Sequence, residues 1–171
     1  MLLTVFLSVS YAADKSAGRI LAEPMVLGGL CLRDVALNHF DHERGQLTGC
    51  AVGVINFRQP RALGQPIMFQ LGLVGYDNVM GWGFRLAPGV WFDEVALTAG
   101  LEIFPQSLSR AEETSTVQLG VWVRSQVFKL PAVPMTVAVE FGLQAGAECY
   151  SGLPCEADDA ISLRVGVGLV R

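Results

Sequence analysis

The sequence is poor in charge, and above all in lysine. Only 16% of its 171 residues are charged, and its two lysines are Lys15 and Lys129, whereas a soluble domain carries about a quarter charged residues. The net charge is -4 and there is no basic block, so nucleic-acid binding has no electrostatic support. No apolar run reaches the ~18 residues that a membrane helix needs. The hydrophobic residues, 51% of the chain, are therefore spread in short segments. The length of the chain fits one domain.

The N-terminus is similar to a secretory signal peptide. Residues 2–9 form an apolar core, and residues 10–13 offer small side chains for cleavage. A positive region before this core is missing, which leaves a start further upstream open. The alternative is a buried first strand or helix. We expect a signal peptide at 1–13 and one mature domain at 14–171.

Eight segments of the mature chain have the length and composition of strands. Their prolines lie mostly at segment ends, where strands tolerate them, and no segment shows a convincing helical period. The expected strands are 20–33, 46–58, 66–77, 80–92, 94–105, 116–129, 135–149 and 159–171. The sequence therefore predicts an all-β fold.

Alternation of apolar and other residues is clear from the fourth segment onward. In MTVAVEFGLQAGAECY, residues 135–150, every second residue from Met135 to Ala147 is apolar. The opposite positions of these segments carry glycines and the polar residues Arg85, Glu102, Gln118, Arg124, Gln126, Glu140, Gln144 and Arg164. A period of two predicts strands with two different faces. The first two segments alternate less clearly, so their facing is open.

The connections also alternate in length. The first, fifth and seventh are long and polar, whereas the second, fourth and sixth are short. An up-and-down barrel places odd and even connections at opposite ends, and outer-membrane barrels have long loops at one end and short turns at the other. We therefore expect a closed antiparallel barrel of eight strands.

The composition of the less apolar face indicates which face meets water. A solvated face would be rich in Lys, Asp, Glu, Ser and Thr, but this face is mostly Gly, Ala and Gln with a few Arg and Glu. Such residues suit a crowded interior, and the aliphatic face suits hydrocarbon. The prediction is a transmembrane barrel. The alternative is a soluble, lipocalin-like barrel with an apolar ligand inside.

Five charged residues would then form a network in the lumen. An isolated buried charge is very costly, and Glu140 has oppositely charged residues of matching parity on both neighbouring strands, Arg124 and Arg164. Arg85 and Glu102 form a second pair of this kind. With Trp91 and Trp122 also inside, an eight-stranded barrel should be plugged. The alternative is that some of these charges lie at loop edges in water.

The four cysteines, an even number in an exported chain, suggest two disulfides. Cys31 and Cys50 flank the first long connection, and Cys149 and Cys155 flank the seventh. We predict the pairs Cys31–Cys50 and Cys149–Cys155, which would staple external loops. The alternative is free buried thiols.

The only two histidines lie in the first long loop. His39, Asp41 and His42, with Glu43 beside them, could ligate a metal or form an acid/base pair. The signal is weak, because no ligand spacing is matched and the chain contains no GxSxG, P-loop or HExxH motif. We therefore expect no catalytic residues, no metal and no cofactor.

In this pattern, the chain resembles the small eight-stranded outer-membrane barrels of Gram-negative bacteria, of the OmpA and OmpX type. Arg164, Gly166 and Leu169 resemble the family's terminal strand signal, but Arg171 stands where the family has an aromatic residue. A truncated chain or a divergent signal would account for this. The resemblance implies the bacterial outer membrane as location, with the lipid bilayer and the barrel-assembly machinery as partners.

The expected role is structural, or one of surface interaction through the external loops, which could bind an extracellular ligand. Because one fold supports many activities, the fold alone does not decide between roles. A lipid-modifying enzyme with His39 or His42 as base, the soluble barrel and a narrow channel are the alternatives.

Overall fold

The structure, a computed structural model, is built from antiparallel strands. It describes residues 20–33, 46–62, 65–76, 81–92, 94–105, 114–130, 133–150 and 154–169. The strands are β1 (Leu21–Arg33), β2 (Gln46–Ala62), β3 (Gln65–Tyr76), β4 (Gly81–Phe92), β5 (Val95–Phe104), β6 (Thr114–Leu130), β7 (Met135–Tyr150), β8 (Glu156–Ala157) and β9 (Ala160–Leu169). The predicted signal peptide and the loop with His39, Asp41 and His42 lie outside the described residues.

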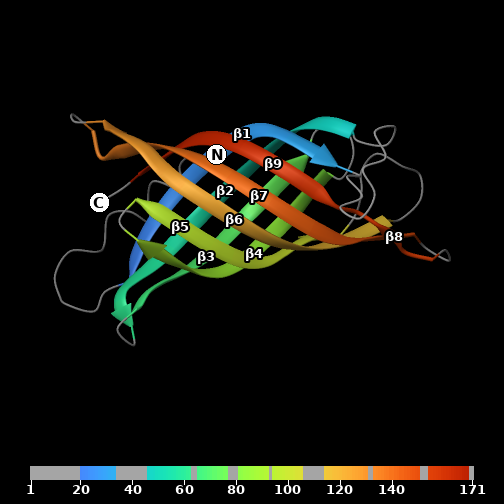
Figure 1. The fold of residues 1–171 in the computed structure, drawn as a ribbon, viewed down its shortest axis with the longest axis horizontal. Helices are drawn as coiled ribbons and strands as arrows, with labels where there is room; N and C mark the ends of the chain where they lie inside the picture. Colours follow the sequence, from blue (N-terminus) through green and yellow to red (C-terminus); the bar gives the residue numbers. More distant parts are fainter. Residues whose placement is uncertain are drawn as a thin grey trace.

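Eight of these strands close into a barrel (Figure 1). Each long strand pairs antiparallel with its neighbours along the chain, and β1 pairs with β9 to close the ring. The predicted all-β, closed, antiparallel barrel of eight strands is confirmed. Among the described residues, no helix is long and apolar enough to cross a membrane.

The last predicted strand, 159–171, is present, but a short strand that was not predicted precedes it. Its main part is β9, which begins at Ala160. The short strand β8 lies before it, in what was expected to be a connection, and pairs with β7 through Ala147 and Glu148. The disulfide Cys149–Cys155 explains this pairing, because it folds the chain back beside the end of β7.

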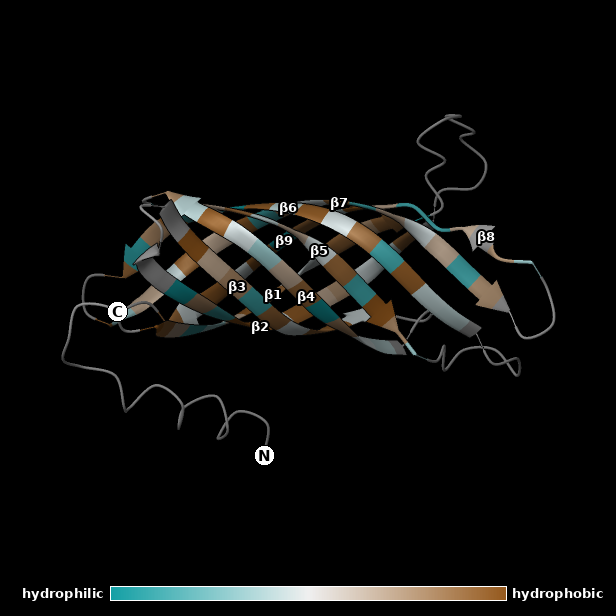
Figure 2. Ribbon diagram, turned by 90° about the horizontal axis from the view of Figure 1, so that it is seen from below, coloured by the Kyte–Doolittle hydropathy of each residue, from teal (hydrophilic) through white to brown (hydrophobic). Residues whose placement is uncertain are grey.

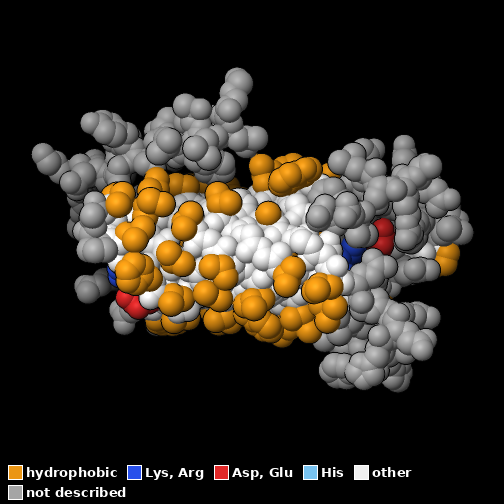
Figure 3. Space-filling model, turned by 90° about the horizontal axis from the view of Figure 1, so that it is seen from above, with side chains coloured by type: hydrophobic (Ala, Val, Ile, Leu, Met, Phe, Trp, Pro, Cys, Tyr) orange, Lys and Arg blue, Asp and Glu red, His pale blue; other side chains and the backbone are white. Residues whose placement is uncertain are grey.

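The two faces of the barrel differ as the alternation predicts. In β5 and β9, buried and more exposed residues alternate along most of the strand, and the hydropathy bands in Figure 2 change in the same rhythm. Outward residues are apolar: Leu119 is 66% exposed and Leu163 is 55% exposed. Figure 3 shows hydrophobic side chains over the visible face, with charged side chains only near its two ends.

A bulge in β6 interrupts the alternation of inward and outward residues near the short-connection end of the barrel. The pairing with β7 shifts between Gln126 and Phe128. A bulge adds one residue to one strand, so two neighbours, Val127 and Phe128, both face outward, at 63% and 55% exposure. The position of this extra residue was not expected from the sequence.

The facing of β1 and β2, left open above, is settled by the structure. Residues of odd number in β1 and of even number in β2 point inward, among them Met25, Leu27, Val52 and Val54, which are 2% exposed or less. These four belong to a cluster of buried apolar side chains that also contains Phe104. The middle of the wall formed by β1 and β2 is thus apolar inside, with buried polar residues toward the strand ends.

Candidate functional site

The candidate site is the charged interior, and its centre is Glu140 on β7. In the sheet, Glu140 lies opposite Arg124 of β6 and Arg164 of β9. Its carboxylate is 2.5 Å from Nη2 of Arg124 and 3.1 Å from Nη1 of Arg164. Arg85 reaches it across the interior from β4, at 2.8 Å from Nη1. Three guanidinium groups therefore share one carboxylate that is 0% exposed.

Arg85 connects Glu140 to a second carboxylate, Glu102. These two residues lie opposite each other on β4 and β5, and Nη2 of Arg85 is 2.6 Å from Oε1 of Glu102. The hydroxyl of Tyr76 and the amide of Gln144 both donate to Oε2 of Glu102, at 3.1 and 2.9 Å. Charge-assisted bonds of this kind are stronger than neutral ones, so Glu102 is held on both oxygens.

Two amide side chains complete the network on the side of β2 and β3. Oδ1 of Asn56 accepts hydrogen bonds from Gln70 and from Arg124, each at 2.9 Å. Oε1 of Gln70 accepts one from Nη1 of Arg85 at 3.2 Å. Since amides offer both donor and acceptor groups, they link arginines that could not contact each other directly.

Trp122 fills the space beside this network. Its ring stacks on the guanidinium of Arg85, 4.1 Å from the ring centroid. A Cβ at Gly142 would lie 2.5 Å from Cδ1 of Trp122, and one at Gly120 would also clash with the ring. The two glycines therefore make room for a tryptophan that is 0% exposed.

Ion pairs also occupy the interior toward each end. Near the short connections, Arg58 pairs with Glu23 at 2.8 Å and stacks on Trp91. Near the long connections, Arg33 pairs with Asp158 at 2.7 Å, and Gln118 donates to the same carboxylate. Together with the central network, these pairs form three layers of buried charge along the barrel axis.

All five charged residues that the sequence selected, Arg85, Glu102, Arg124, Glu140 and Arg164, lie together in the central layer. The structure adds contributors that the sequence analysis missed: Glu23, Arg33, Asn56, Arg58, Gln70, Tyr76 and Asp158. The positions of the cysteines along their strands could have identified four of these contributors. If Cys31 and Cys50 point inward, then Glu23 and Arg33 share the parity of Cys31, and Asn56 and Arg58 share that of Cys50.

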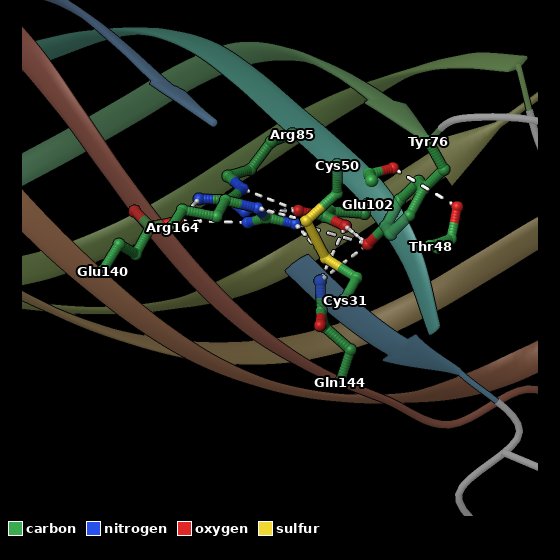
Figure 4. Close-up of a disulfide and its surroundings, with 10 residues drawn as sticks. Cys31, Thr48, Cys50, Tyr76, Arg85, Glu102, Glu140, Gln144 and Arg164 are labelled. Carbon is green, nitrogen blue, oxygen red and sulfur yellow. Dashed lines mark hydrogen bonds and ion pairs between the residues drawn. A yellow bond between two sulfur atoms is a disulfide. The ribbon is translucent and has the colours of Figure 1, made fainter. Parts of the chain in front are cut away.

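Both predicted disulfides are present, but one lies in an unexpected place. Cys149–Cys155 staples the end of β7 to the segment before β8. The sulfurs of Cys31–Cys50 lie inside the barrel, not in a loop, beside Arg164 and Tyr76 (Figure 4). Cys31 is 0% exposed and Cys50 is 5% exposed. The bond joins two strands across the interior face, because both residues have inward parity.

The described part of the chain contains no group of three or more His, Cys, Asp or Glu residues that could hold a metal. The charged side chains of the central layer are bonded to each other, which suits a structural plug. Comparisons with protein-family models, with curated proteins and with solved structures found no match to this chain.

Proposed function

We propose that this protein is a transmembrane β-barrel of a bacterial outer membrane, closed in its middle, with a structural or surface-interaction role. One observation carries the proposal: charge lies inside and apolar residues lie outside. Arg85, Glu102, Glu140 and Arg164 are 0% exposed, whereas Leu119 and Val127 are 66% and 63% exposed. Such large exposed apolar surfaces mark a site of contact with a partner or a membrane, and here they surround a barrel.

The height of the apolar surface supports a bilayer as that partner. On β4, the outward aromatic residues Trp82 and Phe92 are 64% and 56% exposed. The stretch between them spans ~34 Å along the strand, or ~26 Å of height at a tilt of ~40°. Outer-membrane barrels have an apolar band about 25 Å tall between aromatic girdles. The exposed ion pair Lys129–Glu94 lies at the short-connection end of the barrel, where headgroups and water would be expected.

A shallow groove on the outside of β5, β6 and β7 also suits hydrocarbon. Its volume is about 330 Å³, and its outward side chains are all apolar: Ala99, Leu119, Val121, Leu143 and Ala145. An acyl chain could lie between the larger side chains without leaving a polar group unsatisfied.

The filled interior supports a role that does not depend on transport. Five arginines and four carboxylates are buried inside the described part of the barrel, in a fold whose diameter leaves room for little more than side chains. We propose that the ends of the barrel meet partners, including an extracellular ligand at the long-connection end, and that the bilayer and the assembly machinery are the other partners. No enzymatic activity is proposed.

The alternatives have less support. A lipid-modifying enzyme would use His39 or His42, which lie outside the described residues. A soluble, lipocalin-like barrel would carry its apolar face inside and its charges outside, the reverse of the arrangement around Glu140.

Heat-modifiable mobility tests the proposal. The chain is folded in detergent or lipid vesicles, and unboiled and boiled samples are compared on SDS gels. We expect a compact, SDS-resistant band that shifts on boiling, together with loss of the protein from solution when detergent is removed. A chain that folds and stays monomeric in buffer alone would refute the transmembrane proposal.

A further inference from the structure

The disulfide Cys31–Cys50 is buried, since Cys31 is 0% exposed and Cys50 is 5% exposed. Nε of Arg164 is 3.4 Å from Sγ of Cys50, and Nη2 of Arg164 is 3.6 Å from Sγ of Cys31. Tyr76 and Phe104 belong to the same buried cluster as both cysteines. Their rings are packed edge to face, with 5.3 Å between the ring centroids. Figure 4 shows the two sulfurs beside Arg164 and Tyr76.

Buried ion pairs lie on both sides of the bond along the barrel axis. Toward the short connections lies the Glu140 network, in which Arg85, Arg124 and Arg164 meet one carboxylate. Toward the long connections, Arg33 pairs with Asp158, and both are 3% exposed or less. A thiol reagent in solution therefore has no direct contact with either sulfur in the folded barrel.

The chemistry of disulfide formation needs such contact. One cysteine thiolate attacks a disulfide R–S–S–R and releases RS⁻, which leaves R–S bonded to the chain as a mixed disulfide. The second cysteine thiolate attacks this mixed disulfide, forms the Cys31–Cys50 bond and releases the second RS⁻. Two chain thiols are oxidised, and one oxidant disulfide is reduced to two thiols. The intermediate carries the group R on a cysteine sulfur, whereas in the closed barrel both cysteines are buried among other side chains.

We propose that Cys31–Cys50 is formed before the barrel closes, by a thiol oxidant of the disulfide class that acts on the β1–β2 hairpin. The two cysteines need only this hairpin to come together, because β1 and β2 are neighbours along the chain and pair throughout β1. The barrel closes at a different place, the seam between β1 and β9. Assembly thus receives an oxidised hairpin as its substrate. The inference rests on the fold and holds whether or not the outer face meets lipid.

The second disulfide provides an internal control. Cys155 is exposed and Cys149 is partly exposed, and their bond closes a short segment at the end of β7. Its sulfurs remain within reach of reagents after folding. The same molecule therefore carries one pair that folding should protect and one that it should not.

The test compares the variants C149S/C155S, which keeps the interior pair, and C31S/C50S, which keeps the outer pair. Each chain is reduced in urea, folded in detergent under reductant, and then given oxidised glutathione. Aliquots are acid-quenched and denatured, and free thiols are counted by the gel shift of a polyethylene-glycol maleimide. In urea the two pairs should oxidise within about tenfold of each other, whereas in the folded barrel the interior pair should be at least about 100-fold slower.

A reduction experiment on the parent chain complements this test. The oxidised, folded barrel is treated with dithiothreitol, and differential alkylation with mass spectrometry follows each disulfide. We expect Cys149–Cys155 to be reduced while Cys31–Cys50 survives until urea is added. Folding of C149S/C155S only when it is oxidised first would also support the proposal. If the two cysteine pairs of the folded barrel were oxidised at equal rates, or reduced at equal rates, the proposal would be overturned.

Discussion

The carboxylate of Glu140 accepts ion pairs from three arginines of three different strands. Glu140→Gln keeps the shape of the side chain but removes its charge. Because breaking a buried ion pair leaves the partner charges uncompensated, we expect the free energy of unfolding to fall by about 3–5 kcal/mol. Urea unfolding of the barrel in detergent measures this change.

Glu94→Gln is the matched control for this substitution. Glu94 pairs with Lys129 at 3.4 Å, but both side chains are more than half exposed. Exposed pairs contribute at most about 1 kcal/mol, so Glu94→Gln should unfold close to the parent. Equal losses in the two variants would mean that the central network does not stabilise the barrel.

Glycines inside the barrel make room for large side chains, and Gly142 does so for Trp122. A Cβ there would lie 2.5 Å from both Cδ1 of Trp122 and Oγ of Ser162. We expect Gly142→Ala to destabilise the barrel by about 1–3 kcal/mol through overpacking, as measured by thermal or urea unfolding. Tryptophan fluorescence should change as well, because the ring must move.

A second glycine offers the comparison. A Cβ added at Gly28 would meet only the carbonyl oxygen of Cys50, at 3.9 Å, an ordinary contact. Alanine in a strand restricts the unfolded chain more than glycine does, so Gly28→Ala should be neutral or stabilising by up to about 1 kcal/mol. A loss as large as that of Gly142→Ala would show that space around Trp122 is not the cause.

The facing of β4 to β7 and of β9 could be predicted from the sequence, whereas the facing of β1 and β2 could not. In β6, most residues at every second position are aliphatic and those between them are mostly polar or small, so the period of two is visible in the sequence. In β1 and β2, the inward residues Leu27 and Val52 and the outward residues Leu30 and Ile55 are all apolar. Because the middle of these strands is apolar on both faces, the contrast between the faces is confined to the polar residues nearer the strand ends: Glu23, Arg33, Asn56 and Arg58.

The outward face of β6 provides a test of what surrounds the barrel. Val121 lies at the middle of the strand, opposite Ala99 and Leu143, and is 47% exposed. If lipid covers this face, Val121→Arg should lower the free energy of unfolding in vesicles by about 2–4 kcal/mol, because the charge would lie near the bilayer midplane. The measurement is urea-dependent folding in phospholipid vesicles.

Val133 is the control, since it has the same 47% exposure but lies in the short connection after β6. Near an interface an arginine costs about 0–1 kcal/mol, so Val133→Arg should fold almost as well as the parent. In a soluble barrel both substitutions would be surface changes within about 0.5 kcal/mol of the parent. Equal, small effects would therefore contradict the transmembrane proposal.

Contacts between side chains from opposite walls of the barrel were the part of the site that could not be predicted from the sequence. Arg124, Glu140 and Arg164 are neighbours in the sheet, so strand order and parity suffice to bring them together. Arg85 meets Glu140 from a strand that does not pair with β7. Which side chains meet across an interior depends on barrel diameter and stagger, which a list of strands does not fix.

These contacts arrange the buried charge of the barrel in three layers, and we predict that the layers close the barrel to solutes. The layers are centred on Glu23–Arg58, on Glu140 and on Arg33–Asp158. Because the layers follow one another along the barrel axis, removal of one should leave two others in the path of a solute. We expect vesicles that contain the parent barrel to swell in solutions of a small sugar no faster than empty vesicles, and Trp122→Ala to behave in the same way. The rate of light-scattering change measures this swelling. Rapid swelling with the parent would contradict a plugged interior, and rapid swelling with Trp122→Ala alone would mean that the central layer is the only barrier.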